Sequence, residues 1–142
     1  MSFRPTHRPA ARRGASAVEL ALVLPLLAAF FLFTVDFARL YYHYTIVTNC
    51  ARAGALYAAD PTAAAESPYA DYKAVALADA GDLTNPSPSV TSAAGIDGDG
   101  NAYVEVTVSY PFTTVSGYPG LPNPLNVSRT VRARVVPAMP SP

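Results

Sequence analysis

The sequence has few of the side chains on which catalysis, metal binding and disulfide cross-linking depend. Its 142 residues include one cysteine, Cys50, two histidines, His7 and His43, and no tryptophan. A lone cysteine excludes an intramolecular disulfide and a cysteine-based zinc cluster, so Cys50 is expected to pack as a weakly polar side chain, with an intermolecular bridge as the alternative. No histidine is placed to activate Cys50 or a serine, and no phosphate-cradling glycine motif is present. We therefore predict no enzyme, no cofactor and no metal site.

Positive charge is also scarce beyond the N terminus. Ten basic and ten acidic residues give a formal net charge of zero. Four of the basic residues, Arg4, Arg8, Arg12 and Arg13, precede Ala15, and the chain from Ala15 onward carries six basic and ten acidic groups, a net charge of −4. Nucleic-acid binding requires a basic surface that this part of the chain lacks, so no nucleic-acid partner is expected. Residues 1–14 contain two prolines and no acidic residue, and this basic leader is predicted to be disordered.

A long apolar run follows the leader. Residues 15–35 contain a single charge, Glu19, and as a helix they reach about 31 Å, the thickness of a bilayer core. Glu19 must lie near the inner headgroups or find a partner, because an isolated carboxylate in hydrocarbon is costly. Basic residues beside a span stay on the cytoplasmic side. The sequence therefore predicts a single-pass cytoplasmic (inner) membrane protein in contact with lipid, with its N terminus inside and its C-terminal part outside.

The helix is predicted to extend beyond the span to residue 60. Apolar residues continue at helical spacing, aromatic residues cluster just after the span as a membrane-interface belt, and Pro61 stops the helix. Asp36 and Arg39 are three positions apart on one helix face, which places them to form an ion pair. Pro25 removes a backbone hydrogen bond and predicts a helix kink. A cleaved secretory signal is the competing interpretation, but the charge at Glu19 and the length of the unbroken run argue against it.

Residues 61–142 are predicted to form a small exported α+β domain. Ser67 and Pro68 suggest the start of a short helix over 68–80, and prolines and serines over residues 84–95 suggest a loop. Alternation of β-branched residues predicts a strand over 103–110, with Val104, Val106 and Val108 on one face and Pro111 at its end. It also predicts a strand over 127–136, with residues 90–96 as a possible third. Two or three antiparallel strands would then pack on the distal half of the long helix. The acidic segment 97–101 fits a hairpin turn better than a calcium loop, because glycine and glutamate are missing where that loop needs them.

The N-terminal residues carry several features that are specific only when they occur together and in this order. Gly14 is followed five residues later by Glu19, Pro25 lies within the apolar run, and the segment 51–55 reads Ala-Arg-Ala-Gly-Ala. With the intervening Asp36-Phe37-Ala38-Arg39, this order resembles the TadE-like family of pilin-related proteins, minor pseudopilins of the tight-adherence (Tad/Flp) type IVb pilus system. The resemblance covers about the first 60 residues.

The resemblance implies an assembly role in adhesion or secretion. It implies that a prepilin peptidase recognises Arg12, Arg13, Glu19 and Leu20 and cuts between Gly14 and Ala15. Glu19 would then neutralise the N-terminal amine of an adjoining subunit. The implied partners are the peptidase, other pilin-like subunits and the Tad assembly machinery. A minor filament component, an initiating tip subunit and a membrane-retained assembly factor all fit; the rival interpretation is an uncleaved signal-anchored protein with a partner- or cell-wall-binding domain.

Overall fold

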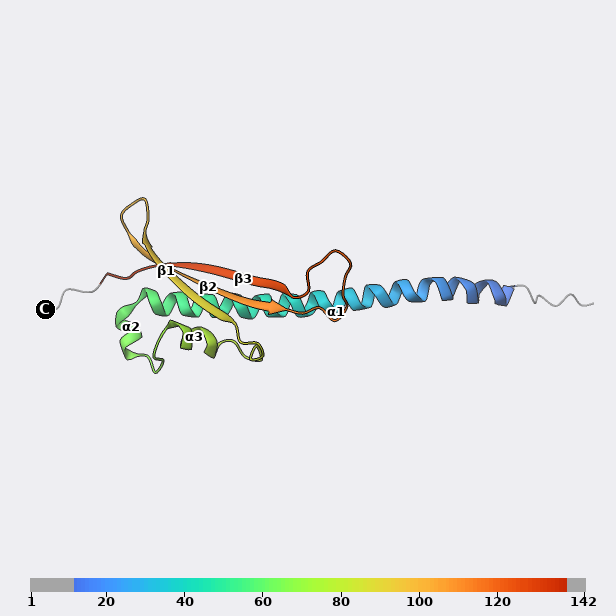
Figure 1. Cartoon of the computed structure of the whole chain (residues 1–142), viewed down its shortest axis with the longest axis horizontal. Helices are drawn as coiled ribbons and strands as arrows, with labels where there is room; N and C mark the ends of the chain where they lie inside the picture. The colour runs from blue at the N-terminus through green and yellow to red at the C-terminus, as the bar shows by residue number, and fades with distance from the viewer. Residues whose placement is uncertain (1–11, 138–142) are drawn as a thin grey trace, which may run out of the picture.

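The computed structural model describes residues 12–137 of the chain. The element order is one long helix, two short helices and three strands: α1 (Arg12–Ala59), α2 (Pro61–Glu66), α3 (Tyr72–Ala78), β1 (Ser89–Ile96), β2 (Ala102–Phe112) and β3 (Leu125–Arg134). Figure 1 shows α1 as a rod whose N-terminal half projects alone, while the sheet lies along its C-terminal half. The predicted α+β class, with a long N-terminal helix against a small antiparallel sheet, is confirmed.

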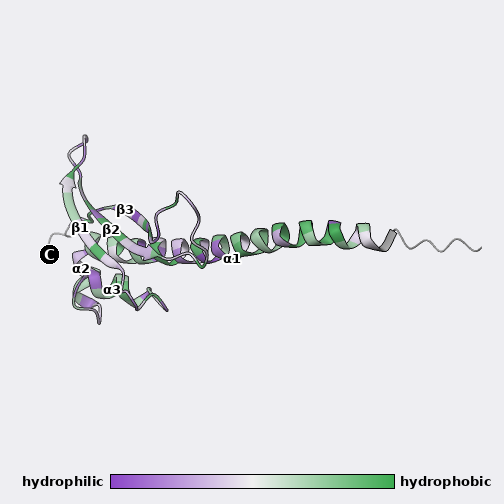
Figure 2. Ribbon diagram, turned by 45° about the vertical axis from the view of Figure 1, so that its right-hand side comes forward, coloured by the Kyte–Doolittle hydropathy of each residue, from purple (hydrophilic) through white to green (hydrophobic). Residues whose placement is uncertain are grey.

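The two halves of α1 differ in their surroundings. Residues 14–34 are all exposed, whereas residues such as Val47, Cys50 and Ala51 in the second half are fully buried. Figure 2 shows the projecting half as mostly hydrophobic. Among the described residues one helix, Gly14–Ala59 within α1, is long and apolar enough to cross a membrane, and its most apolar stretch is not buried against the rest of the chain.

The sheet has the order β1-β2-β3, and both pairs are antiparallel. As predicted, Val104, Val106 and Val108 of β2 share one face, which is buried against α1. On the opposite, solvent-facing side of the sheet, three polar residues of β2 each contact the polar residue directly across from them on β3, and these cross-strand pairs stabilise the register of the two strands. These pairs are Glu105 with Arg132, Thr107 with Thr130, and Ser109 with Ser128.

The core lies between the second half of α1, the inner face of β2 and β3, and α3. Small residues on α1 allow this close packing: at Gly54 an added Cβ would lie 3.2 Å from Val106 Cγ1 and 3.3 Å from both Ala76 Cβ and the Tyr72 carbonyl oxygen. The main buried residues are Val47, Cys50, Ala51, Ala55, Ala76, Leu83, Val90, Val106, Val108, Phe112 and Val127.

The sequence predicts one short helix, whereas the described part of the structure has two: α2 was not predicted, and α3 begins later and ends earlier than the predicted range 68–80. Asp60 is extended, so α1 ends before Pro61 as expected, but Pro61 then occupies the first turn of α2, and Asp60 caps that helix by accepting from the backbone N–H groups of Thr62 and Ala63. The helix predicted over 68–80 starts only at Tyr72, because Asp71 is its N-cap and accepts from Ala74 N at 2.7 Å. Ser67 instead ends α2.

Two strand predictions also need correction. β1 begins at Ser89, so the prediction of a loop is wrong from that residue onward. The possible third strand over 90–96 is present as β1. β2 does not stop at Pro111 but continues to Phe112. Because β1 pairs with β2 only as far as Ser109, Pro111 has a neighbouring strand on one side alone, where proline is tolerated. Between β1 and β2, residues 97–101 form the expected hairpin turn: Asp97 accepts from the backbone N–H of Asn101 at 2.7 Å, and Gly100 adopts a φ of 82°.

Candidate functional site

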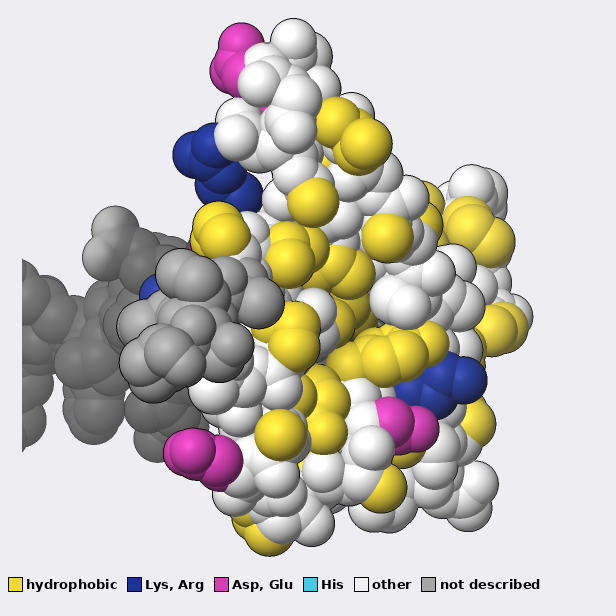
Figure 3. Space-filling model, turned by 90° about the vertical axis from the view of Figure 1, so that its left-hand side faces the viewer, with side chains coloured by type: hydrophobic (Ala, Val, Ile, Leu, Met, Phe, Trp, Pro, Cys, Tyr) yellow, Lys and Arg dark blue, Asp and Glu magenta, His cyan; other side chains and the backbone are white. Residues whose placement is uncertain are grey.

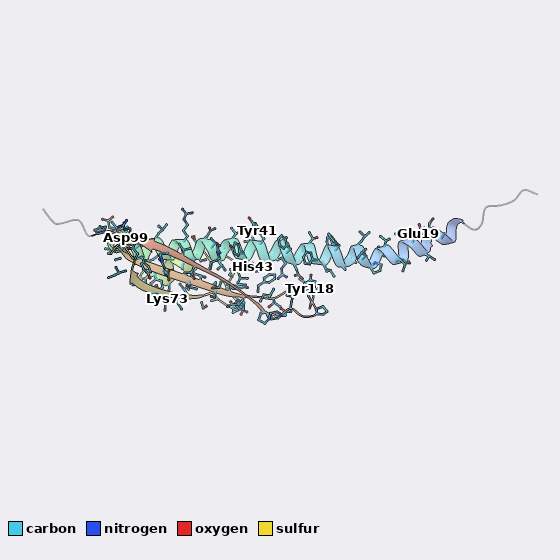
Figure 4. The ribbon with its side chains drawn as sticks, turned by 90° about the horizontal axis from the view of Figure 1, so that it is seen from above. Glu19, Tyr41, His43, Lys73, Asp99 and Tyr118 are labelled. Atoms are coloured by element: carbon cyan, nitrogen blue, oxygen red, sulfur yellow. The ribbon has the colours of Figure 1, made fainter. Side chains whose placement is uncertain are left out.

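The predicted site residues lie on the projecting half of α1. Gly14, Ala15, Glu19 and Leu20 are all exposed, and Figure 4 shows Glu19 near the start of this helix, far from the sheet. Gly14 has open space around it, since an added Cβ would meet no atom within 4 Å. Any enzyme or subunit that contacts these residues therefore meets a helix that the sheet and the short helices leave uncovered.

Other predictions concern the leader, the first residues of α1 and Pro25 within the helix. Residues 1–11 of the leader lie outside the described part of the chain, and Arg12 and Arg13 form the first two positions of α1. The helix continues through Pro25 as one element. Cleavage after Gly14, recognition by a peptidase and a kink at Pro25 stay predictions.

Asp36 connects the end of the apolar run to the sheet. Its carboxylate is buried, 4% exposed, and accepts hydrogen bonds from the backbone N–H groups of Val115 (2.8 Å) and Ser116 (3.3 Å) and from the Tyr118 hydroxyl (3.1 Å). Arg39 Nη1 forms the predicted ion pair with Asp36 at 3.3 Å. Val115, Ser116 and Tyr118 lie in the segment between β2 and β3, residues 113–124, which we call the junction loop.

The hydrogen bonds to Asp36 also set its acidity. The backbone N–H of Val115 lowers the pKa of the carboxyl most strongly, with further lowering by Ser116, Tyr118 and Arg39, although burial opposes them. Asp36 is therefore ionised at neutral pH. The Tyr118 hydroxyl has a raised pKa, because burial and its bond to Asp36 both disfavour the phenolate.

Apolar contacts complete the attachment of the junction loop. The ring of Tyr118 meets that of Phe33 edge to face, with centroids 6.2 Å apart. A small hollow of about 90 Å³ lies between α1 and the loop, lined by side chains that include Phe37, Leu40 and Leu121. The loop is thus fixed beside residues 33–40, at the end of the sheet nearest the projecting half of α1 (Figure 1).

His43 and Cys50 take structural places in the sheet-covered half of α1. His43 packs edge to face against Tyr110 and Phe112, with centroids 5.3 and 5.2 Å away, and burial followed by the charge of Arg39 lowers its pKa. Its Nδ1 is buried without a hydrogen-bond partner among the described residues. Cys50 is fully buried, as its predicted packing role requires, and burial with the nearby charge of Asp79 raises the thiol pKa to about 11.

The opposite end of the molecule carries a second apolar surface. Figure 3 shows hydrophobic side chains gathered there around a hollow of about 640 Å³. Leu56, Ala59 and Val136 are among its lining residues, with Arg132 and Arg134 beside them. Among residues 12–137, no group of three histidine, cysteine, aspartate or glutamate side chains is arranged to hold a metal ion.

Sequence reasoning found Asp36 but missed its main role. The spacing of Asp36 and Arg39 on one helix face predicts their ion pair. The other partners of Asp36 lie 79 to 82 residues further along the chain, so no local pattern could reveal them. The one available signal was an acidic residue directly after an apolar run, a position where a carboxylate commonly has a partner.

Comparison with known proteins supports the predicted resemblance. Residues 14–56 match the family model described as TadE-like protein, a segment that makes up less than a third of the chain. No curated protein and no solved structure gave a match. The matched segment begins at Gly14, includes Glu19 and Asp36, and ends within the buried part of α1.

Proposed function

We propose that this protein is a minor pilin or pseudopilin that acts in the assembly of a Tad-type pilus for adhesion or secretion. The match of residues 14–56 to the TadE-like family carries the proposal. That family is pilus-related and typically non-enzymatic, in keeping with a role in assembly instead of turnover.

The exposed apolar half of α1 supports a membrane anchor. Residues 15–35 have the length of a bilayer core, and their large side chains, such as Leu22, Leu26 and Phe30, are exposed. We propose that they cross the cytoplasmic membrane with the basic leader inside, since lysine and arginine beside a span stay on the cytoplasmic side. The sheet, α2 and α3 then lie outside.

Glu19 is proposed to act once the leader is removed. Cleavage after Gly14 would make Ala15 the new N terminus and Glu19 the fifth residue of the mature chain. A carboxylate this deep in an apolar helix needs a compensating positive charge, and the terminal amine of a neighbouring subunit would supply one. The proposed partners are a prepilin peptidase, other pilin-like subunits and the Tad assembly machinery.

The N-terminal residue of the mature protein tests this proposal. We would determine it by mass spectrometry of membranes from a host with and without its prepilin peptidase, for the wild type, Gly14→Val and Gly117→Val. Both glycines have open space around them, so either valine is accommodated without a clash. We expect a start at Ala15 that requires the peptidase and is lost only in Gly14→Val.

Other N termini would contradict the proposal. An intact leader in the peptidase-containing host would favour the uncleaved signal-anchored protein. A start beyond Ala38 would mean a secreted domain, and the span and the role of Glu19 would both be wrong.

A further inference from the structure

The junction loop is held at one particular height along α1. Asp36 and Phe33 bind it through Val115, Ser116 and Tyr118, as described above. Residues 33–40, which line its inner side, extend over only about 10 Å of the helix axis. They include the last turn of the apolar run and the first turn after it. If residues 15–35 cross a bilayer, the loop therefore lies at the level where hydrocarbon gives way to headgroups.

The junction loop and the strand residues on either side of it are uncharged. Residues 106–128 contain no aspartate, glutamate, lysine, arginine or histidine. Within the junction loop, Val115 and Leu121 are 63% and 55% exposed, and on the adjoining part of α1 Phe33 and Phe37 are 56% and 60% exposed. The exposed apolar side chains of loop and helix thus lie together around the end of the span, with the partly exposed guanidinium of Arg39 beside them at Thr113.

We propose that the junction loop is a second membrane contact, which places Val115 and Leu121 in the headgroup layer of the leaflet nearest Asp36. This inference rests on the proposed anchoring by α1. Irregular backbone is excluded from the hydrocarbon core because its polar groups need partners, but the hydrated headgroup layer supplies them. Amphipathic rings such as that of Tyr118 favour the same layer.

This contact fixes the angle between the sheet and the membrane. A single helix leaves the attached domain free to tilt, whereas a helix and a loop that touch the bilayer at separate points restrict its orientation. Asp36 couples the two contacts, because its hydrogen bonds hold the loop backbone against the helix.

The absence of tryptophan makes the inference directly testable. The wild type has none, so each substitution gives a protein with one tryptophan. We would reconstitute the full chain carrying Leu121→Trp, Val115→Trp, Leu27→Trp or Ile96→Trp into vesicles of phosphatidylcholine and phosphatidylglycerol. All four positions are exposed apolar residues; Leu27 lies in the span and Ile96 at the distant β1–β2 hairpin. Circular dichroism would verify that each variant is folded.

Quenching by brominated phosphatidylcholine gives the depth of each tryptophan. We expect quenching of both loop variants, stronger when bromine is near the headgroup end of the acyl chain than near its methyl end. Leu27→Trp should be quenched by the deeper bromine, and Ile96→Trp by neither.

Three results would overturn the inference, each for a different reason. If both loop variants are unquenched while Leu27→Trp is quenched, α1 is a membrane anchor but the junction loop does not contact the membrane. Loop emission that is blue-shifted but unquenched, and that depends on the protein-to-lipid ratio, would assign this surface to a second protein copy. Absence of quenching in Leu27→Trp would remove the anchor and, with it, the loop contact.

Discussion

Asp36 stabilises the junction between helix and sheet because one carboxylate satisfies several donors that the fold brings together. Two of these donors are backbone N–H groups in the junction loop, and one is the hydroxyl of Tyr118. Buried polar groups are tolerated only when their hydrogen bonds are made, so the carboxylate and the loop depend on each other. Loss of its charge is therefore expected to weaken the attachment of the loop.

Acid should remove this contribution. The folded-state pKa of Asp36 lies below its ordinary value of 3.8, chiefly through the N–H of Val115, so the folded protein holds this proton less tightly than the unfolded chain. The stabilisation is then fully present well above about pH 4 and decreases as the pH falls through the ordinary pKa toward the folded one. We expect Asp36→Asn to lower the Tm of the full chain in detergent at neutral pH, by an amount that shrinks in acid.

A turn carboxylate provides the control for Asp36→Asn. Asp99 is exposed at the β1–β2 hairpin, and Asp99→Asn should leave the Tm almost unchanged at every pH. Asp97, whose pKa is also lowered, mainly by the N–H of Asn101, is present in both variants, so its titration cancels in the comparison. A pH-independent difference between Asp36→Asn and the wild type would contradict the assigned role.

At the scale of elements, the contact of α1 with β2 and α3 depends on a residue without a side chain. Gly54 lies inside the helix, five residues before its last residue Ala59, and glycine inside a helix is ordinarily unfavourable by about 1 kcal/mol relative to alanine. A Cβ atom added at Gly54 would lie 3.2 Å from Val106 Cγ1, and α3 lies on the same side of the helix. Close packing of three elements is therefore achieved at some expense of helix propensity.

Overpacking this position should destabilise the fold. We expect Gly54→Val to lower the free energy of unfolding by about 1–3 kcal/mol, because interiors do not accept added methyl groups without displacement. Denaturant unfolding in detergent would measure it. Arg52→Val introduces the same β-branched residue on the exposed face of α1, and should change stability by only a few tenths of a kcal/mol. If Gly54→Val were instead as stable as the wild type or more stable, helix propensity, which favours valine over glycine, would outweigh packing at this position.

The elements that could be predicted are those with strong local patterns. The apolar run predicts α1, and the alternation around Val106 and along β3 predicts the strands and their buried face. The start of α3 was missed because Ser67 and Asp71 are both good caps, and only tertiary packing selects Asp71. The end of β2 was missed because Pro111 breaks a strand only where two neighbours need its N–H, and the position of β1 determines that.

At the scale of the whole molecule, apolar surface is divided between a buried core and an uncovered rod. The core is small and built largely of alanine and valine, whereas leucine and phenylalanine are concentrated on the exposed residues 18–37 of α1. This surface is far larger than a soluble monomer ordinarily exposes, and lipid or neighbouring helices must cover it. Glu19 is the charged side chain that such a cover has to accommodate.

Loss of the charge at Glu19 should impair assembly without unfolding the protein. Removal of one partner from a buried ion pair costs about 3–5 kcal/mol, so Glu19→Gln should weaken association between subunits by about a hundredfold or more. Cross-linking of membranes and recovery of sheared pili would measure it. Glu66→Gln, at an exposed position on α2, is the matched control. Normal assembly by Glu19→Gln would restrict this carboxylate to a place at the inner headgroups.

The sheet is attached to α1 near both limits of the part it covers. Asp36 holds the junction loop at one limit, and at the other the carbonyl of Ala59 accepts a hydrogen bond from Val136 N at 2.8 Å. Under tension a helix lengthens by breaking successive hydrogen bonds, and residues 36–59 can lengthen only if these attachments to the sheet also break. Residues 17–32 are all exposed and are not held by these attachments, and Pro25 removes one of their own hydrogen bonds. A pulling force along α1 therefore acts on a stiff segment in series with an extensible one, and the extensible segment yields first.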